Sequence, residues 1–326
     1  MKTGIILANL GTPTAPTKKA IRAFLRHFLQ DKRVIQDVHP WLWRVILEGV
    51  ILPFRPKKLV HNYQKIWLKE GSPLLVSSLL QKKALAAALQ TDDITVTSAM
   101  TYGEPSFSNA LATLEAAACE RIIVIPLYPQ YSSTTTAAVF DGLARALATK
   151  MVIPEIVFVA DYHRHALYIQ AISRSITDYW QQHGRGDLLL FSFHGIPVSY
   201  CERGDTYPAA CEQTVAAVVE ALQLKSTEYA LSYQSRLGYK PWLQPYTIDF
   251  LPEQARAGLK RVDVIAPGFA TDCLETLEEL QLQNKNAFLT AGGKEFHYIP
   301  ALNDTAKHIA LLAALVRERV YYTLRI

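Results

Sequence analysis

Short apolar runs that alternate with helix-length segments constrain the fold of this chain most. Each run is rich in Ile, Val and Leu and ends in Gly, Pro, Ser or Thr, as strands buried in a parallel sheet do. The runs span residues 4–10, 94–100, 121–126, 156–160, 187–193, 228–233 and 262–266. Helices are predicted between them, most clearly at 76–90, 107–119, 137–149, 166–183 and 208–223. The alternation predicts an α/β fold with parallel sheets flanked by helices.

The length of 326 residues favours two domains of ordinary size. A helix that ends near Lys150 gives way to Pro154 and a new strand, so we predict one domain over 1–152 and another over 153–326. Each half holds three or four strands with helices between them. Both are therefore expected to be doubly wound units.

Composition excludes several classes of protein. Half of the residues are hydrophobic and 19% are charged, which is typical of a soluble globular protein. The net charge of +5 is modest and the Lys and Arg residues are scattered, so no nucleic-acid partner is expected. Residues 1–10 resemble a strand more than a secretion signal, and we expect a cytoplasmic protein.

Polar or unusual residues directly follow five of the predicted strands. In open α/β sheets, ligands bind outside the carboxyl ends of the strands, so these segments are expected to converge on one cleft, most naturally between the two domains. The segments are residues 9–13, 126–132, 192–197, 233–236 and 267–269.

His194 follows the apolar run 188–193 and precedes Gly195. An imidazole at the exit of a strand, beside flexible backbone, is well placed to act as a ligand or a base. The alternative is a histidine that only hydrogen-bonds a neighbouring loop. Position alone leaves both interpretations open.

A second cluster lies in the predicted helix that follows Phe269. Asp272, Glu275 and Glu279 are spaced by three and four residues, so their carboxylates are expected to share one helix face. Like charges on one face repel each other unless a cation or protons are present. Asp272 and Glu275 also fit a capping box, which is a purely structural alternative.

Imidazole and carboxylates together suit a first-row divalent metal such as Fe(II), and carboxylates with raised pKa values accept protons near neutral pH. The chain has no paired Cys and His at zinc spacing, no complete Gly-rich nucleotide loop and no nucleophile elbow around Ser192. The chemistry therefore points to handling of a metal and of protons.

Residues 41–58 combine aromatic and aliphatic side chains with four cations, Arg44, Arg55, Lys57 and Lys58. Such a segment suits a bilayer interface, where its cations meet lipid head groups or substrate carboxylates. A core helix with a solvated basic end is an equal alternative. The stretch is too short and too polar for the roughly 20 residues of a membrane span.

Several motifs, in order along the chain, resemble the signatures of the ferrochelatase family. The most specific are Ser192 to Pro197, Gly204 to Pro208, Tyr233 to Gly238, Trp242 to Thr247 and Pro267 to Glu279. Further matches at 9–13, 71–74, 127–132 and 300–303 extend the resemblance over nearly the whole chain.

The resemblance implies two Rossmann-like domains of the chelatase type, a porphyrin cleft with a lip in the first domain, and insertion of Fe(II) into protoporphyrin IX as the last step of haem biosynthesis. His194 and Glu275 would bind the metal and catalyse insertion. Asp272, Glu278 and Glu279 would continue an acidic path for protons. Porphyrin-binding residues would be Leu10, Tyr102, Tyr131, Ser132, Gln234, Arg236 and Trp242.

The resemblance also implies that iron is a substrate and that no cofactor is permanently bound. No cysteine cluster follows Asn303, so no iron–sulfur centre is expected. Thr101 stands where many relatives carry a basic residue, which removes a cation expected there. The nearest rivals are a coproporphyrin ferrochelatase or a cobalt chelatase, and a non-catalytic porphyrin carrier is the rival from another class.

Overall fold

The structure is a computed structural model that describes residues 2–90, 93–238 and 240–322. The contacts between residues divide the chain into two units. The first runs up to Asp161 and includes the segment from Asp304 onward, and the second is Tyr162–Asn303. The sequence predicted a single division between 152 and 153. The contacts differ because β4 (Glu155–Phe158) pairs with β3 (Arg121–Pro126), and α12 (Ala306–Tyr322) packs on α4 (Pro73–Leu89).

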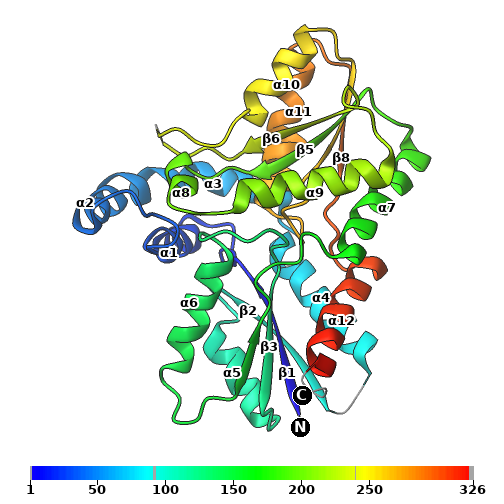
Figure 1. The fold of residues 1–326 in the computed structure, drawn as a ribbon. Helices are drawn as coiled ribbons and strands as arrows, with labels where there is room; N and C mark the ends of the chain where they lie inside the picture. The colour runs from blue at the N-terminus through cyan, green and yellow to red at the C-terminus, as the bar shows by residue number, and fades with distance from the viewer. Residues whose placement is uncertain (1, 91–92, 239, 323–326) are drawn as a thin grey trace. The chain divides into compact units, whose positions relative to one another are not determined.

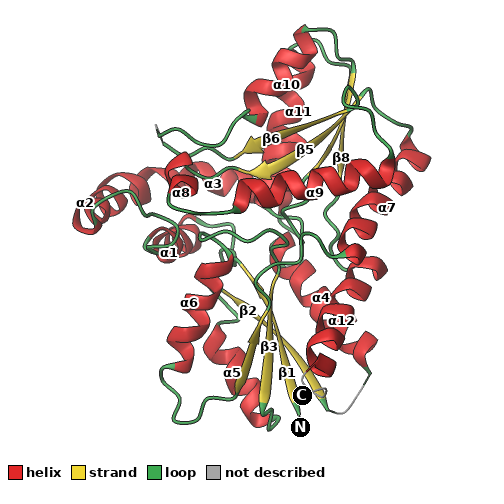
Figure 2. Cartoon of the chain, viewed as in Figure 1, coloured by secondary structure: helices red, strands yellow, loops and turns green. Residues whose placement is uncertain are grey.

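The first unit holds a four-stranded parallel sheet in the order β2-β1-β3-β4, covered by helices on both faces (Figures 1 and 2). Its other elements are β1 Thr3–Asn9, α1 Lys18–Leu29, α2 Pro40–Ile46, the π-helix η1 Leu47–Ile51, α3 Leu52–Ile66, β2 Ile94–Met100, α5 Phe107–Ala116 and α6 Thr136–Leu147. Ile6 and Ala8 on β1 pack with Leu111 and Leu114 of α5 in a buried core. The alternate residues Ile5 and Leu7 are buried as well, as expected of a strand covered on both faces.

The second unit repeats this architecture with the strand order β6-β5-β7-β8. Its elements are α7 Ala166–His183, β5 Leu188–His194, α8 Val198–Glu202, α9 Tyr207–Leu222, β6 Tyr229–Gln234, α10 Thr247–Arg256, β7 Arg261–Ile265, the π-helix η2 Glu275–Asn284, α11 Lys285–Thr290 and β8 Glu295–Ile299. Leu188 and Leu190 pack with Leu251 and Phe288 beneath α10 and α11. The predicted α/β fold with two parallel sheets is confirmed.

The order of strands places a topological switch point at the end of β5. From β5 the chain moves first to β6 on one side and then to β7 on the other, so the crossover connections diverge at this strand. β1 occupies the same place in the first unit. Ligands of doubly wound sheets bind at this point, outside the carboxyl ends of the strands. His194 is the last residue of β5.

Two elements differ from the sequence-based expectation. β8 was not predicted, because this edge strand mixes Glu295 and His297 with its apolar residues and pairs with β7 alone. The helix predicted from Asp272 is instead η2, a π-helix that begins at Glu275. The π form is rare, and it occurs often at functional sites.

Candidate functional site

The His194 side chain is half-buried and its ring has a defined orientation. Its Nδ1 lies 2.7 Å from the carbonyl oxygen of Gly195. Because a carbonyl only accepts hydrogen bonds, Nδ1 carries the hydrogen, and Nε2 is the ring nitrogen left to bind a metal or a proton. The ring also lies near the rings of Trp242 and Phe269, each with centroids 6.4 Å away. His194 therefore offers its Nε2 atom to a ligand, with the rings of Trp242 and Phe269 nearby.

Glu279 lies close enough to His194 and Glu275 for their charges to act on it. Its carboxylate accepts hydrogen bonds from the backbone N–H of Ser235, at 2.8 Å, and from the Ser235 hydroxyl. Burial raises the pKa of Glu279; the Ser235 hydroxyl and the charge of His194 lower it, the negative charge of Glu275 raises it, and the net shift is upward. Glu279 thus interacts electrostatically with both His194 and Glu275.

The π-helical form of η2 determines which of its acidic residues lie on the same side of the helix. Each π turn takes in one residue more than an α turn, so Glu275 and Glu279, four apart, remain neighbours. Glu278 is buried, and its carboxylate accepts a hydrogen bond from Gln283, five residues later. The Glu278 side chain is therefore bonded within the helix itself.

Asp272 lies before η2, and its carboxylate is held by residues from other elements. It accepts hydrogen bonds from the Tyr298 hydroxyl at 2.7 Å, the Asn303 amide at 2.7 Å and the Thr276 hydroxyl at 2.9 Å. The expected common face of Asp272, Glu275 and Glu279 is thus replaced by a pair, Glu275 and Glu279. Asp272 joins the start of η2 to β8 instead.

Two further predicted residues of the second unit, Gln234 and Trp242, lie beside His194. Gln234 pairs with His194 in the sheet register, and its Nε2 donates to the main-chain oxygen of Glu275 at 2.9 Å. Trp242 is half-buried beside the His194 ring. Arg236 is exposed, with its guanidinium 4.7 Å from the centre of the Tyr246 ring. Gly195 permits this close packing, because a Cβ there would lie 3.1 Å from the Gln234 carbonyl oxygen and 3.2 Å from the Trp242 ring.

Leu10 and Tyr102 meet at the carboxyl ends of β1 and β2 in the first unit. The Tyr102 N–H donates to the Leu10 carbonyl at 2.8 Å, and the buried hydroxyl donates to Asp31 at 2.9 Å. Burial and then the negative charge of Asp31 raise the pKa of Tyr102, which keeps the phenol neutral. Gly11 has φ +105°, and a Cβ there would lie 1.8 Å from the Tyr102 carbonyl oxygen, so this turn requires glycine.

Tyr131 and Ser132 lie in the loop that follows β3, at the same end of the sheet as Leu10. Ser132 is buried, with its hydroxyl 2.9 Å from that of Thr134, and Tyr131 is half-buried. Each unit thus gathers its own predicted site residues at the carboxyl ends of its strands.

Ser235 and Phe269 belong to the site, although no motif assigned either residue a role of its own. Ser235 has φ 69°, a left-handed conformation that is unfavourable for a residue other than glycine. That conformation accompanies two hydrogen bonds from Ser235 to Glu279. Both residues lie in the polar segments after strands, which is the one signal that pointed to them.

Residues 41–58 form α2, η1 and the start of α3, and several of their apolar side chains face solvent. The exposed fraction is 65% for Trp41 and 73% for Phe54, and Val45 and Val50 are exposed too. A cavity of about 370 Å³ beside α2 is lined in part by Lys32, Trp43 and Arg44. No helix among residues 2–90, 93–238 and 240–322 is long and apolar enough to cross a membrane.

In the described part of the chain, no three or more His, Cys, Asp or Glu side chains lie together as a ready-made metal site. The second unit offers the His194 imidazole and the carboxylates of Glu275 and Glu279, and Glu279, whose pKa is raised, interacts with the charges of the other two. Groups of these kinds bind first-row divalent cations, and a carboxylate with a raised pKa accepts protons at a higher pH than an ordinary one does.

A family model and the sequences of known proteins indicate the same family for this chain. A family model described as Ferrochelatase matches residues 2–320. The chain is 52% identical over 316 residues to the ferrochelatase of Vibrio cholerae serotype O1, covering 97% of this chain and 98% of that protein. It is 49% identical over 319 residues to the ferrochelatase of Vibrio parahaemolyticus, covering 98% of each. With the ferrochelatase of Aeromonas hydrophila it shares 47% over 317 residues, covering 97% of this chain and 98% of the relative.

Solved structures of similar fold include two of SirB. One is SirB from Bacillus subtilis with Fe3+, at a TM-score of 0.53 and 12% identity, covering 99% of this chain and 97% of that chain. The other is the sirohydrochlorin chelatase SirB from Bacillus subtilis subspecies spizizenii in complex with cobalt, at a TM-score of 0.53 and 10% identity, covering 98% of this chain and 95% of that chain. At these identities the likeness concerns the fold alone.

Proposed function

The chain belongs to the ferrochelatase family, and on that basis we propose that His194 and Glu275 bind the iron that the enzyme inserts into porphyrin. A member of this family is a metal chelatase of the lyase class and acts in haem biosynthesis. The observation that carries the proposal is the orientation of His194, whose Nδ1 is bonded to Gly195 while Nε2 keeps its lone pair.

The reaction exchanges metal for protons. Fe(II) enters the porphyrin as two pyrrole protons leave, so the site must supply both a weak ligand for iron and an acceptor for protons. In this proposal His194 Nε2 faces the macrocycle, and its one lone pair binds the iron with Glu275 before transfer and accepts a pyrrole proton once the iron has left it. Glu275 binds the metal together with His194, and imidazole with carboxylate suits a first-row divalent ion.

Glu279 is the next acceptor in the proposed acidic path. Its raised pKa and its interaction with His194 and Glu275 support this role, because a carboxylate with a raised pKa takes protons closer to neutral pH. Asp272 and Glu278 remain predicted members of the path. Their carboxylates accept hydrogen bonds from Tyr298 and Gln283, respectively, so any proton passing them would have to exchange with these partners.

Porphyrin binding is proposed for the predicted residues of both units. Trp242 offers an aromatic face beside His194, and Arg236 offers an exposed cation that suits a substrate carboxylate. The other proposed contacts are Leu10, Tyr102, Tyr131, Ser132 and Gln234. Iron enters as a substrate, and the proposed chemistry uses no permanently bound cofactor.

The roles of His194 and Glu275 are tested with His194→Ala and Glu275→Gln, each beside a matched control. The controls are His297→Ala and Glu295→Gln, which lie at the other end of the same sheet. We expect both site variants to bind porphyrin, measured by fluorescence quenching, and to insert metal at least about 100-fold more slowly. The proposal fails if the site variants insert metal as fast as the controls do.

Protoporphyrin IX is the proposed porphyrin and ferrous iron the proposed metal. The test compares protoporphyrin with coproporphyrin, and iron with cobalt, in one insertion assay followed by absorbance. A higher kcat/KM with coproporphyrin or with cobalt would identify one of the rival chelatases. Binding of porphyrin without any turnover would indicate a carrier.

We further propose a cytoplasmic enzyme that contacts the membrane surface through residues 41–58. The exposed side chains of Trp41 and Phe54 support this, and so do the cations at 44, 55, 57 and 58. Apolar side chains flanked by Lys and Arg suit the interface of an anionic bilayer.

A further inference from the structure

Three buried hydroxyl groups form a line beneath the proposed site in the second unit. The Ser232 hydroxyl lies 2.8 Å from that of Thr247, and the Thr247 hydroxyl lies 3.0 Å from that of Ser192. The Ser192 hydroxyl then donates to Oε1 of Gln234 at 2.8 Å. All three hydroxyl-bearing side chains are fully buried, and they come from β6, α10 and β5.

The bond from Gln234 to Glu275, at the end of this line, fixes the direction of every hydrogen bond in it. The main-chain oxygen of Glu275 only accepts, so the Gln234 atom that faces it must be the NH2 group. Oε1 of Gln234 therefore faces Ser192 and takes the single Ser192 proton. Thr247 must then donate to Ser192, and Ser232 must donate to Thr247.

The line ends on the first residue of η2. Gln234 lies next to His194 in the sheet register, and the Gly195 N–H donates to the Gln234 carbonyl at 2.8 Å. Its amide side chain bonds the main chain of Glu275. The next residue, Ser235, bonds the carboxylate of Glu279. The end of β6 thus contacts His194, Glu275 and Glu279 at once.

We propose that Ser192 is a positioning residue for metal insertion: with Thr247 behind it, Ser192 fixes the Gln234 amide, and the amide fixes the main chain of Glu275 relative to His194. This rests on the role proposed above for Glu275. Burying three hydroxyls costs free energy unless each is bonded, and a fully satisfied polar line holds its members in one arrangement. Partners outside a metal-binding shell commonly set the orientation of the groups inside it.

The test uses a matched pair, Ser192→Ala and Ser232→Ala. Both substitutions remove one hydroxyl oxygen from a fully buried serine in neighbouring strands. Ser192→Ala frees the Gln234 amide to turn, whereas Ser232→Ala leaves in place the bond from Thr247 to Ser192 and the bond from Ser192 to Gln234. We expect Ser192→Ala to lower kcat for zinc insertion into protoporphyrin by about 10- to 100-fold with an unchanged porphyrin KM, and Ser232→Ala to lower it much less.

Further variants separate positioning from general packing. Thr247→Val removes the hydroxyl at nearly constant volume, and Thr247→Ser keeps it. The valine variant should lie between the two alanine variants in kcat and the serine variant should restore the rate. Thr214→Val is the control, because the Thr214 hydroxyl is equally buried but bonds the Ala210 carbonyl on α9. Thermal unfolding midpoints of all variants show whether each one folds.

A double-variant cycle distinguishes failure of this inference from failure of the role of Glu275. In a Glu275→Gln background, Ser192→Ala should cause little further loss, because the carboxylate that it positions is gone. Equal kcat losses in Ser192→Ala and Ser232→Ala, or a full further loss in the Glu275→Gln background, would overturn the positioning role. Wild-type kcat in Glu275→Gln alone would instead overturn the function proposed for Glu275, and the inference with it.

Discussion

Glu279 is subject to opposing influences at the scale of a single residue. Burial raises its pKa, the hydroxyl of Ser235 and the charge of His194 lower it, and the negative charge of Glu275 raises it again. The net shift is upward, so the folded protein holds this proton to a higher pH than the unfolded chain does. A raised pKa lets this carboxylate take up a proton at a higher pH than an ordinary glutamate does.

The raised pKa of Glu279 predicts a pH dependence of stability. A group whose pKa is higher in the folded state stabilises the protein below its unfolded pKa, and this contribution is lost as pH rises through the folded value. Glu279→Gln does not titrate. The unfolding free energy of wild type should therefore fall relative to that of Glu279→Gln as pH rises above about 4, as measured by urea denaturation at each pH. A rise of wild type relative to the variant over that range would contradict the assignment.

The sequence predicted the positions of His194 and Asp272 better than it predicted their hydrogen-bond partners. An apolar run followed by Gly195 was enough to place His194 at the carboxyl end of a strand. Which nitrogen is free depends on the Gly195 carbonyl, whose orientation no sequence pattern indicates. The partners of Asp272 come from Tyr298 and Asn303, which lie far along the chain, so its role in joining η2 to β8 required the structure.

At the scale of elements, η2 shows the limit of spacing rules. Helix spacing predicted Asp272, Glu275 and Glu279 on one face, but η2 begins at Glu275 and holds only Glu275 and Glu279 together. Within the π-helix, Glu278 accepts a hydrogen bond from Gln283. The π form has no local signature in the sequence. Bonds at its two ends accompany it, from Gln234 to the Glu275 carbonyl and from the Asn284 amide to the Glu279 carbonyl, each at 2.9 Å.

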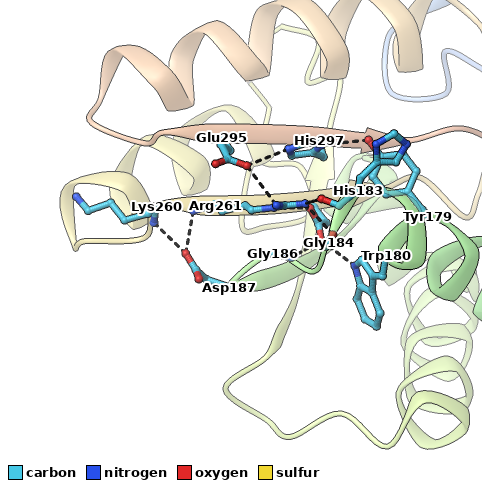
Figure 3. A network of polar contacts seen from close by, with 11 residues as sticks. Tyr179, Trp180, His183, Gly184, Gly186, Asp187, Lys260, Arg261, Glu295 and His297 are labelled. Carbon is cyan, nitrogen blue, oxygen red and sulfur yellow. Dashed lines mark hydrogen bonds and ion pairs between the residues drawn. The ribbon is translucent and has the colours of Figure 1, made fainter.

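The two ends of the sheet in the second unit carry different kinds of polar cluster. At the end opposite His194, Arg261 begins β7 and Glu295 begins β8, and the two form an ion pair with atoms 3.2 Å apart (Figure 3). Arg261 also donates to the carbonyls of His183 and Gly184, each at 2.7 Å. The buried carboxylate of Asp263 accepts from the Trp180 indole at 2.7 Å and the Gly186 N–H at 2.6 Å. These bonds hold α7 and the residues just before β5 against the start of β7.

Because it lies far along the sheet from His194, this cluster is predicted to affect stability and not catalysis. Asp263→Asn removes a buried charge that accepts two hydrogen bonds, and should lower the free energy of unfolding by about 1–3 kcal/mol with kcat unchanged. The control Glu295→Gln alters an exposed member and should cost less than about 1 kcal/mol. Urea denaturation and the insertion assay measure both quantities. A large loss of kcat in folded Asp263→Asn would show that the separation of roles is wrong.

At the scale of the whole molecule, both units use one strand order and gather their site residues at equivalent strand ends. Apolar runs in the sequence located seven of the eight described strands, because buried parallel strands are continuously apolar. The return of α12 to the first unit could not be predicted, since it depends on packing against α4, over 200 residues earlier in the chain.

Membrane contact is also a prediction about the molecule as a whole. The protein should sediment with liposomes that contain phosphatidylserine, and added salt should weaken this binding, because cations and apolar side chains act together. Trp41→Ser and Phe54→Ser should each reduce sedimentation several-fold. Val152→Ser is the matched control, since Val152 is 82% exposed in the loop between α6 and β4. Equal sedimentation of all three variants, or none by wild type, would rule out contact through residues 41–58.

Anaerobic insertion of ferrous iron into protoporphyrin IX, followed by absorbance, is the most direct test of the role of His194 in metal insertion. The proteins to compare are wild type, His194→Ala and the control His297→Ala, all shown to be folded and to bind porphyrin. We expect wild type and His297→Ala to produce protohaem at similar rates, and His194→Ala to bind porphyrin but barely to metallate it. Insertion by His194→Ala at the wild-type rate would contradict this role.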